Sequence, residues 1–214
     1  MLGIMFMQAE SHPLPALVVA LLPPILVCLI LLAWAARLKR LGRFAGEPGM
    51  LHAWAARLRS IRAREMALDI SALGSSTLVT LLAPVLMLGF WQGGHRGAAL
   101  VIGGSTALAS ALGSALKRLT GRVRPGAATT AYFGSSFPSS HTLMGSTLYG
   151  SAAAQFLLHE GLTPCTALAA LGALLIALLI GCTRVLLRVH YLSDVIAGWL
   201  LAAALITSGV LLAA

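Results

Sequence analysis

Residues 161–183 read GLTPCTALAALGALLIALLIGCT and contain no Asp, Glu, Lys or Arg. A helix needs about 20 predominantly apolar residues to cross the hydrocarbon core of a bilayer, so this stretch is long enough to span a membrane. The whole chain has the same character: of its 214 residues 58% are hydrophobic and 10% are charged, with a mean hydropathy of +0.91. Soluble proteins carry roughly 25% charged residues. The composition therefore excludes a water-soluble globule, a disordered chain and a coiled coil, and it predicts a polytopic membrane protein.

Six stretches lack Asp, Glu, Lys and Arg over a length suited to a span: 11–36, 70–95, 97–116, 125–158, 161–183 and 195–214. The fourth is too long for one helix, and its part from Pro125 to Pro138, rich in Gly, Pro and Ser, predicts a loop before a helix over 139–158. The last helix is expected to begin near His190. Backbone polar groups in lipid must be paired within their own segment, and these runs have helical lengths. We therefore predict an all-α bundle of six transmembrane helices that forms a single domain over 1–214.

The cysteines give no sign of a disulfide framework or a metal site. Cys28, Cys165 and Cys182 stand singly in apolar sequence, without a nearby second cysteine or a ligand spacing typical of zinc. We expect them to face lipid or to pack between helices.

Basic residues are confined almost entirely to one face of the predicted bundle. With six crossings, that face receives the segments 37–65, 117–138 and 184–190, which hold eight, four and two Lys or Arg residues, and only Arg96 falls on the other face. Two interpretations stay open. The positive-inside rule would place the basic face in the cytoplasm without any functional meaning. An anion-binding site at the membrane surface would need the same charges.

The segment 47–65, between the first two spans, shows helical periodicity. Leu51, Trp54, Leu58 and Ile61 recur at helical spacing, and arginines occupy the other faces. This pattern is typical of an amphipathic helix that lies in the membrane interface against anionic lipid headgroups. An ordinary connecting loop is the alternative.

Three clusters of polar residues lie at predicted helix ends on the basic face. They are Lys117-Arg118-Leu119-Thr120-Gly121-Arg122-Val123-Arg124-Pro125, Pro138-Ser139-Ser140-His141, and Thr183-Arg184 followed by His190 and Asp194. The glycine of the first cluster can end the third helix, and the serine pair of the second can cap the fourth. Two histidines, one carboxylate and several cations therefore fall at one depth on one face.

These residue types suit the transfer of a phosphoryl group. His190 and Asp194 are four residues apart, so on a helix the carboxylate can hold one ring nitrogen protonated and leave the other as a nucleophile or base. The free N–H groups at the helix start near Ser139 and Ser140 can bind an anion. Each feature alone also has a plain structural explanation, as an interfacial histidine or a helix cap, and their coincidence carries the argument. Donors for the oxygens of the anion are the cations Lys117, Arg124 and Arg184.

The three clusters resemble the signature of the type 2 phosphatidic acid phosphatase superfamily, which is written K-x6-R-P, P-S-G-H and S-R-x5-H-x3-D. In this chain the motifs read K-x6-R-P over 117–125, P-S-S-H over 138–141 and T-R-x5-H-x3-D over 183–194. Ser140 replaces the glycine of the second motif, and Thr183 replaces the serine of the third. The hydropathy of the chain resembles the membrane branch of the family over nearly its whole length.

The resemblance implies a phosphatase that needs no metal or other cofactor and works through a phosphohistidine. It implies that His190 attacks phosphorus, that Asp194 orients His190, and that His141 protonates the leaving oxygen. The phosphate-binding residues that it implies are Lys117, Arg124, Ser139, Ser140 and Arg184. The arginines without a counterpart in the motifs are expected only to meet lipid headgroups: Arg118, Arg122 and Arg188.

The implied substrate is a membrane lipid with a phosphate monoester or diphosphate, such as undecaprenyl diphosphate, phosphatidate, phosphatidylglycerophosphate or the phosphates of lipid A. The expected partners are this substrate and anionic lipid headgroups, and no nucleic acid. A lipid phosphotransferase of the same family, or a non-enzymatic binder or transporter of anionic lipids, is the alternative. The resemblance further implies a multi-pass protein of the cell (inner) membrane with an extracytoplasmic active site, although the positive-inside rule predicts the reverse orientation.

Overall fold

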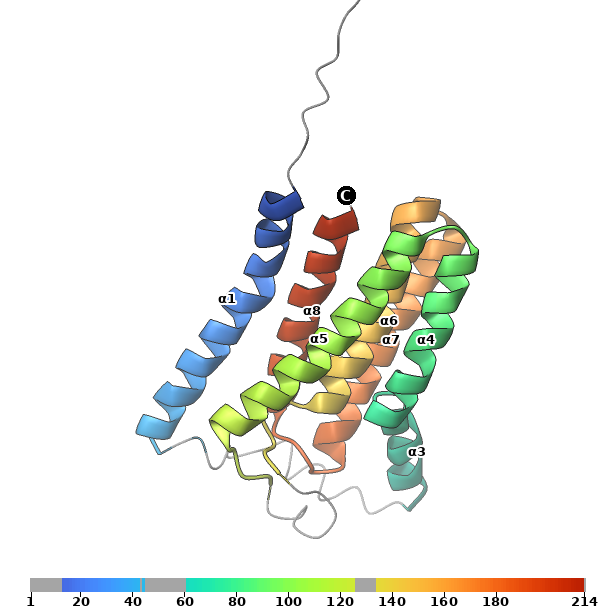
Figure 1. The fold of residues 1–214 in the computed structure, drawn as a ribbon. Coiled ribbons are helices and arrows are strands. Elements are labelled where there is room, and N and C mark those ends of the chain that lie inside the picture. Colours follow the sequence, from blue (N-terminus) through green and yellow to red (C-terminus); the bar gives the residue numbers. More distant parts are fainter. Residues whose placement is uncertain (1–12, 43, 45–60, 126–133, 214) are drawn as a thin grey trace, which may run out of the picture.

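The structure, a computed structural model, describes residues 13–42, 44, 61–125 and 134–213, and every regular element in these ranges is a helix. The helices are α1 (Pro13–Arg40), α3 (Ile61–Ala72), α4 (Ser76–Gln92), α5 (Arg96–Thr120), α6 (Ser140–Glu160), α7 (Pro164–Leu186) and α8 (Leu192–Ala213). Figure 1 shows α1 and α4 to α8 side by side in one bundle, with α3 at its lower end. The predicted all-α class is confirmed.

The chain is a membrane protein by the length and composition of its helices. Four helices are individually long and apolar enough to cross a bilayer, namely α1 from Ala16, α5, α7 and α8, and α3 with α4 qualifies as a pair bent by 43°. Large apolar side chains such as Leu168, Leu171 and Leu175 are exposed on α7, as expected for a surface that meets lipid. Length and hydropathy do not select α6, so the count of six spans stays a prediction.

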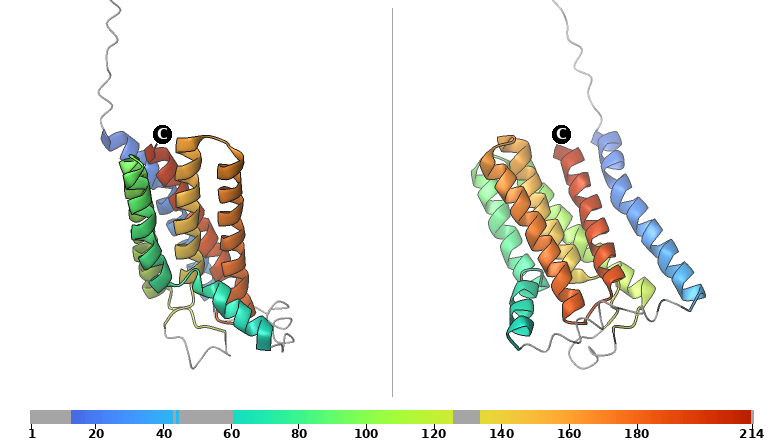
Figure 2. Two further views of the ribbon diagram at one scale, coloured as in Figure 1. Left: turned by 90° about the vertical axis from the view of Figure 1, so that its right-hand side faces the viewer. Right: turned by 180° about the vertical axis from the view of Figure 1, so that it is seen from behind.

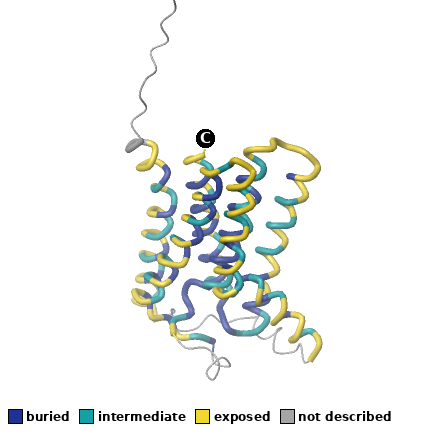
Figure 3. The backbone as a smooth tube through the Cα atoms, turned by 45° about the vertical axis from the view of Figure 1, so that its right-hand side comes forward, coloured by how far each residue is buried: buried dark blue, intermediate teal, exposed yellow. Residues whose placement is uncertain are grey.

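α6 occupies the middle of the bundle, where it packs against α4, α5, α7 and α8. α1 packs at the outside against α8 and, to a smaller extent, against α5 (Figure 2). Figure 3 shows that buried residues lie on the helix sides that face the interior, and exposed residues on the outer sides. The buried residues of α6 include several polar ones: Thr142, Ser146, Thr147, Ser151 and Gln155. Because its neighbours shield these groups, α6 does not need an apolar composition.

The helix ends around the basic face largely fall where the sequence predicts them. Gly121 ends α5 in a left-handed conformation with φ of 59°, and its N–H donates to the carbonyl of Lys117 at 3.0 Å. Ser139, in an extended conformation, is the N-cap residue of α6. α8 begins at Leu192, close to the start expected near His190, after a turn between α7 and α8.

The second predicted span, 70–95, is not one helix. α3 ends at Ala72 and α4 begins at Ser76, after a turn in which the Ser75 hydroxyl accepts a hydrogen bond from the N–H of Leu78 at 3.2 Å. The same turn brings Gly74 directly against the first turn of α6. The break therefore lets the chain approach α6 more closely than a continuous helix with side chains could.

The predicted interfacial helix over 47–65 lies outside the described residues, except for 61–65, which form the start of α3. In this part Ile61, Arg62 and Arg64 are exposed. α3 runs obliquely to the long helices and contacts α7 (Figure 2).

Substitution of Gly74 tests the close contact between the α3–α4 turn and α6. A Cβ atom at this position would lie 2.5 Å from the carbonyl oxygen of His141 and 2.8 Å from Cγ2 of Ile180. We expect Gly74→Ala to destabilise the protein by about 1–3 kcal/mol, since neither backbone can move freely. Gly89→Ala in α4 is the control, because a Cβ there meets no atom within 4 Å. Thermal unfolding in detergent measures both, and equal stability of the two variants would contradict the contact.

Candidate active site

One end of the bundle holds a cavity of about 660 Å³, where α5 and α7 end and α6 begins. Its walls carry four cations and two histidines: Lys117, Arg118, Arg124, Arg184, His141 and His190. Ser76 of α4 and Ser114 of α5 extend the lining between these two helices. None of the described lining residues is acidic, and within the described ranges no group of three or more His, Cys, Asp or Glu residues could hold a metal ion. The cavity therefore suits an anion.

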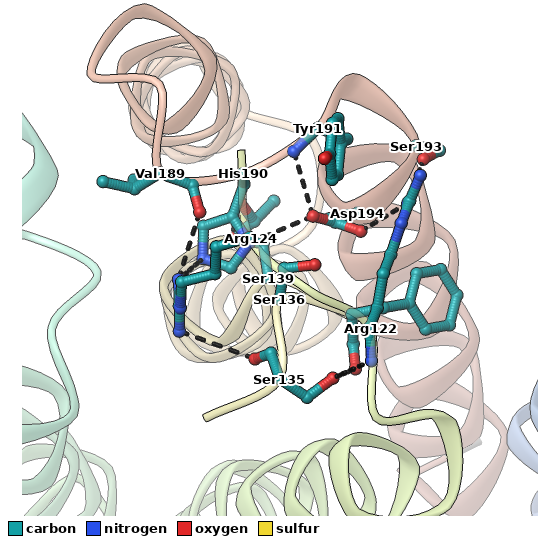
Figure 4. A network of polar contacts seen from close by, with 12 residues as sticks. Arg122, Arg124, Ser135, Ser136, Ser139, Val189, His190, Tyr191, Ser193 and Asp194 are labelled. Carbon is teal, nitrogen blue, oxygen red and sulfur yellow. Dashed lines mark hydrogen bonds and ion pairs between the residues drawn. The ribbon is translucent and has the colours of Figure 1, made fainter. Parts of the chain in front are cut away.

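The first motif leaves α5 as an extended segment whose side chains alternate in direction. Arg122 is 2% exposed, whereas Val123 is 66% exposed. The segment is fixed by residues 134–136: the N–H of Arg122 donates to the Ser135 hydroxyl and the N–H of Ser136 donates to the Arg122 carbonyl, both at 2.9 Å. Arg122 reaches Asp194 at the start of α8, and Arg124 reaches Val189 and His190 in the turn before α8 (Figure 4).

The third motif turns the chain sharply between α7 and α8. Arg188 adopts a left-handed conformation with φ of 57°, and the N–H groups of Val189 and His190 both donate to the carbonyl of Arg184. His190 thus precedes α8 instead of lying on it. Nevertheless its Nδ1 lies 3.3 Å from Oδ2 of Asp194, as the four-residue spacing predicts.

The two ring nitrogens of His190 have different partners (Figure 4). Nδ1 lies against the carboxylate of Asp194, and Nε2 lies 3.3 Å from Nη1 of Arg124. Arginine can only donate hydrogen bonds, so this arrangement requires an unprotonated Nε2 and a proton on Nδ1. His190 lines the cavity, and its Nε2 carries the lone pair that a nucleophile needs.

The other predicted cations are held in place by neutral oxygens. Nζ of Lys117 donates to the carbonyl of Ser135 at 2.8 Å, and Nη1 of Arg184 donates to the hydroxyl of Ser71 at 2.6 Å. Arg124 donates to the carbonyl of Val189 at 3.1 Å. Neutral acceptors fix the direction of a cation without cancelling its charge, so these contacts preorganise the cavity for an anion.

Some residues of the second motif line the cavity and others lie in the core. Ser140 and His141 line the cavity, but Ser139 does not. Ser139 is fully buried, its hydroxyl accepts a hydrogen bond from Thr142 at 3.0 Å, and its N–H donates to the backbone carbonyl of Asp194 at 3.0 Å. Ser139 therefore joins the start of α6 to the start of α8, and the expected contact of its side chain with phosphate stays a prediction.

The expectation that Arg122 meets only lipid headgroups is wrong. Its side chain is fully buried, and Nη1 lies 2.7 Å from Oδ1 of Asp194. Arg118 also departs from that expectation, because it lines the cavity. The sequence gives Arg122 no place in the three motifs, and its role becomes visible only when the structure shows its contact with Asp194.

Burial controls the ionisation of His190. Burial disfavours the charged imidazolium and lowers the pKa of His190 to about 4. The hydrogen bond and negative charge of Asp194 raise this pKa, while the positive charges of Arg184 and Lys117 lower it further. The free imidazole is therefore neutral at neutral pH, in the form that can attack an electrophile.

Residues 98–213 match the model of the PAP2 superfamily, and this range contains all three motifs. A transmembrane PAP2-type phosphatidylglycerolphosphate phosphatase from Bacillus subtilis has a similar structure, with a TM-score of 0.72, 26% sequence identity, and coverage of 86% of this chain and 92% of that chain. LpxE from Aquifex aeolicus shares the fold, with a TM-score of 0.54, 23% identity, and coverage of 74% of this chain and 92% of its own. No curated protein sequence matches the chain.

The ionisation of His190 can be measured directly. The chain has six histidines, so ¹⁵N-histidine labelling gives a small set of ring signals, and the signal lost in His190→Asn identifies His190. We expect this ring to stay neutral as the pH falls to about 5, since its pKa lies near 4 and protonation occurs only below the pKa. A titration centred near pH 6.5 would contradict the desolvated environment described here.

Proposed function

Because the chain belongs to the PAP2 superfamily, we propose that it is a membrane phosphatase that hydrolyses a phosphate monoester or diphosphate of a lipid. One observation carries the proposal: a neutral imidazole, that of His190, lies between a buried carboxylate and a cavity lined by cations. An oriented imidazole is a nucleophile, and the cations suit the phosphoryl group that it would attack.

In the first half of the reaction, Nε2 of His190 attacks phosphorus. A P–N bond forms and the P–O bond to the lipid breaks, which leaves a phosphohistidine. Nδ1–H donates to Asp194, so the carboxylate stabilises the positive charge that develops on the ring. His141, on the cavity wall, gives its proton to the leaving oxygen. The surrounding cations disfavour a protonated His141, and the negative charge of the bound phosphate offsets this effect.

In the second half, water replaces the lipid. His141, now neutral, takes a proton from the water as its oxygen attacks phosphorus, the P–N bond breaks, and inorganic phosphate leaves. The sum is the hydrolysis of one phosphate ester or anhydride bond, with His190 and His141 returned to their starting forms. No step requires a group beyond those that line the cavity and the carboxylate behind it.

Arg124 has a double role in this scheme. In the structure its Nη1 lies against Nε2 of His190, where the incoming phosphorus would have to be. A phosphate oxygen is a stronger acceptor for a guanidinium than a neutral ring nitrogen. Binding of the phosphate would therefore draw Arg124 off Nε2 and expose the lone pair, with Lys117 and Arg184 binding further oxygens.

A lipid substrate fits the position of the cavity. The lining residues Ser76 and Ser114 lie on α4 and α5 and are both exposed, so the cavity opens between these helices at the end of a bundle with apolar outer faces. A headgroup could enter there while its acyl chains stay in the bilayer. The activity named for the similar Bacillus subtilis structure makes phosphatidylglycerophosphate the first substrate to test, followed by undecaprenyl diphosphate, phosphatidate and lipid A phosphates.

The orientation forms part of the proposal: the cavity faces the extracytoplasmic side of the cell (inner) membrane. The count of basic residues argues for the cytoplasm. However, Lys117, Arg124 and Arg184 are directed into the cavity and Arg122 is buried against Asp194, so part of that count serves the site instead of the topology.

Alanine substitution of the two histidines tests the enzymatic proposal. We expect His190→Ala to abolish phosphate release from a detergent-solubilised preparation, because no other described imidazole faces Asp194. His141→Ala should lower kcat by about 10²–10⁴-fold, the usual contribution of a general acid. His159→Ala is the matched control, since His159 lies at the other end of α6, stacked on His95.

Other outcomes of the same assay separate the alternatives. If the wild type releases phosphate from none of the lipids, and both variants bind lipid normally, the chain is an anionic-lipid binder or transporter. If the donor lipid loses phosphate without equal release of inorganic phosphate, the chain is a phosphotransferase.

Cysteine labelling in intact cells tests the orientation. In a chain whose native cysteines are replaced by serine, we expect Leu41→Cys, at the cavity end, to react with a membrane-impermeant maleimide. Leu162→Cys, in the loop at the opposite end, should react only after permeabilisation. Both positions are exposed, at 56% and 83% respectively, so access depends on the side of the membrane. The reverse pattern would place the cavity in the cytoplasm.

A further inference from the structure

We propose that Arg122 is a positioning residue for the nucleophile: it fixes the carboxylate of Asp194 and neutralises it on the side away from the cavity, so that the carboxylate orients His190 without repelling phosphate. The role in turnover rests on the proposed phosphatase function. The residue touches neither ring nitrogen of His190 in any described contact and is not part of the cavity lining. It acts through Asp194.

The guanidinium of Arg122 is held by hydrogen bonds to side chains and to the backbone. Nη1 donates to Oδ1 of Asp194 at 2.7 Å and to the hydroxyl of Ser193 at 2.6 Å. Nε donates to the backbone carbonyl of Phe44 at 2.9 Å. Both the arginine and the aspartate side chains are 0% exposed, so this is a fully desolvated ion pair.

The guanidinium of Arg122 also makes cation–π contacts with two aromatic rings. Its carbon lies 4.2 Å from the ring centroid of Tyr191 and 5.0 Å from that of Phe44. Phe44 in turn packs against Phe137, which precedes the second motif. A buried cation with these partners cannot reorient toward a substrate, which sets Arg122 apart from the cavity cations. Phe44 lies outside the range that matches the family model, so the N-terminal part of this chain contributes to the environment of the nucleophile.

The two carboxylate oxygens of Asp194 have different partners. Oδ1 forms the ion pair with Arg122. Oδ2 accepts hydrogen bonds from Nδ1 of His190 and from the N–H of Tyr191, the latter at 2.9 Å. This division fixes which oxygen faces the imidazole. It also leaves the pair of Arg122 and Asp194 with no net charge, so the bound phosphate faces the positive charges of the cavity without an opposing carboxylate behind them.

Loss of Arg122 has a defined electrostatic consequence at His190. The charged and titratable groups around this ring are Asp194 of α8, Arg124 after α5, Lys117 of α5, Arg184 of α7 and His141 of α6. Without Arg122, the negative charge of Asp194 would act on the imidazole undiminished. The coupled pair of His190 and Asp194 would then take up its proton at a higher pH, and less of the neutral nucleophile would be present.

The experiment compares Arg122→Gln and Arg122→Lys with the wild type in detergent. For Arg122→Gln we expect kcat to fall by roughly 10²-fold, the scale of a misplaced catalytic group, with little change in KM because phosphate contacts stay intact. The acid limb of the kcat/KM profile should move to higher pH. Arg122→Lys keeps the charge and one donor, so it should restore the pH profile and part of kcat. Arg124→Gln, by contrast, should raise KM.

A double-mutant cycle separates positioning from general stability. If Arg122 acts through Asp194, then Arg122→Gln should add little further loss in an Asp194→Asn background. Arg96→Gln is the matched control: Arg96 also stacks on an aromatic ring, that of Trp91, but lies at the other end of the bundle. Equal loss of activity by Arg122→Gln at every pH, or full additivity with Asp194→Asn, would overturn the proposal, as would wild-type kcat in Arg122→Gln.

A measurement without turnover keeps this proposal distinct from the phosphatase function. The ¹⁵N signal of His190 should titrate at higher pH in Arg122→Gln than in the wild type, and Arg122→Lys should reverse the shift. This result would support the positioning role even if no lipid tested releases phosphate. An unchanged titration in a folded Arg122→Gln variant would overturn it. If Arg122→Gln does not fold, Arg122→Lys decides: a kcat below that of the wild type with an unchanged KM supports the role, and a wild-type kcat overturns it.

Discussion

The buried carboxylate of Asp194 is the constraint on which the rest of the site depends. Its two oxygens and its backbone carbonyl bind Arg122 from the first motif, Ser139 from the second and His190 from the third. A desolvated carboxylate is costly to bury unless its lone pairs are satisfied, so the fold must bring all three segments together. His190 is therefore oriented by the same contacts that join the ends of α5, α6 and α8.

The cavity gathers like charges, which is unfavourable to the folded protein. Lys117, Arg124 and Arg184 are directed to one space, and no described acidic residue lines it. Their mutual repulsion is tolerated because neutral oxygens hold each side chain and because the cavity is open to solvent. Functional sites commonly retain such local conflicts. A bound anion would relieve the repulsion, so the affinity of the cavity for an anion and the cost of gathering these cations have one origin.

Much of the architecture was predictable from the sequence, because helix ends and charges obey local rules. The apolar runs predicted the helices, Gly121 the end of α5, and Ser139 the cap of α6. Tertiary contacts decided the rest. The break between α3 and α4 depends on the approach of Gly74 to α6, and the burial of Ser139 depends on Thr142 and Asp194. Arg122 was misassigned because a basic residue near a membrane surface is normally solvated, and only the fold supplies its carboxylate and aromatic partners.

α6 shows why hydropathy is an incomplete guide to such a bundle. Hydropathy detects contact with lipid, and α6 is enclosed by α4, α5, α7 and α8. Two of its interior polar side chains bond to neighbouring helices: the Ser151 hydroxyl lies 3.0 Å from that of Ser105, and Gln155 donates to the carbonyl of Gly209 at 3.4 Å. Interhelical bonds of this kind stabilise packing in a medium that offers no water. Because hydrogen bonds tie α6 to α5 and α8, a central helix with many polar side chains can still hold His141 at the cavity.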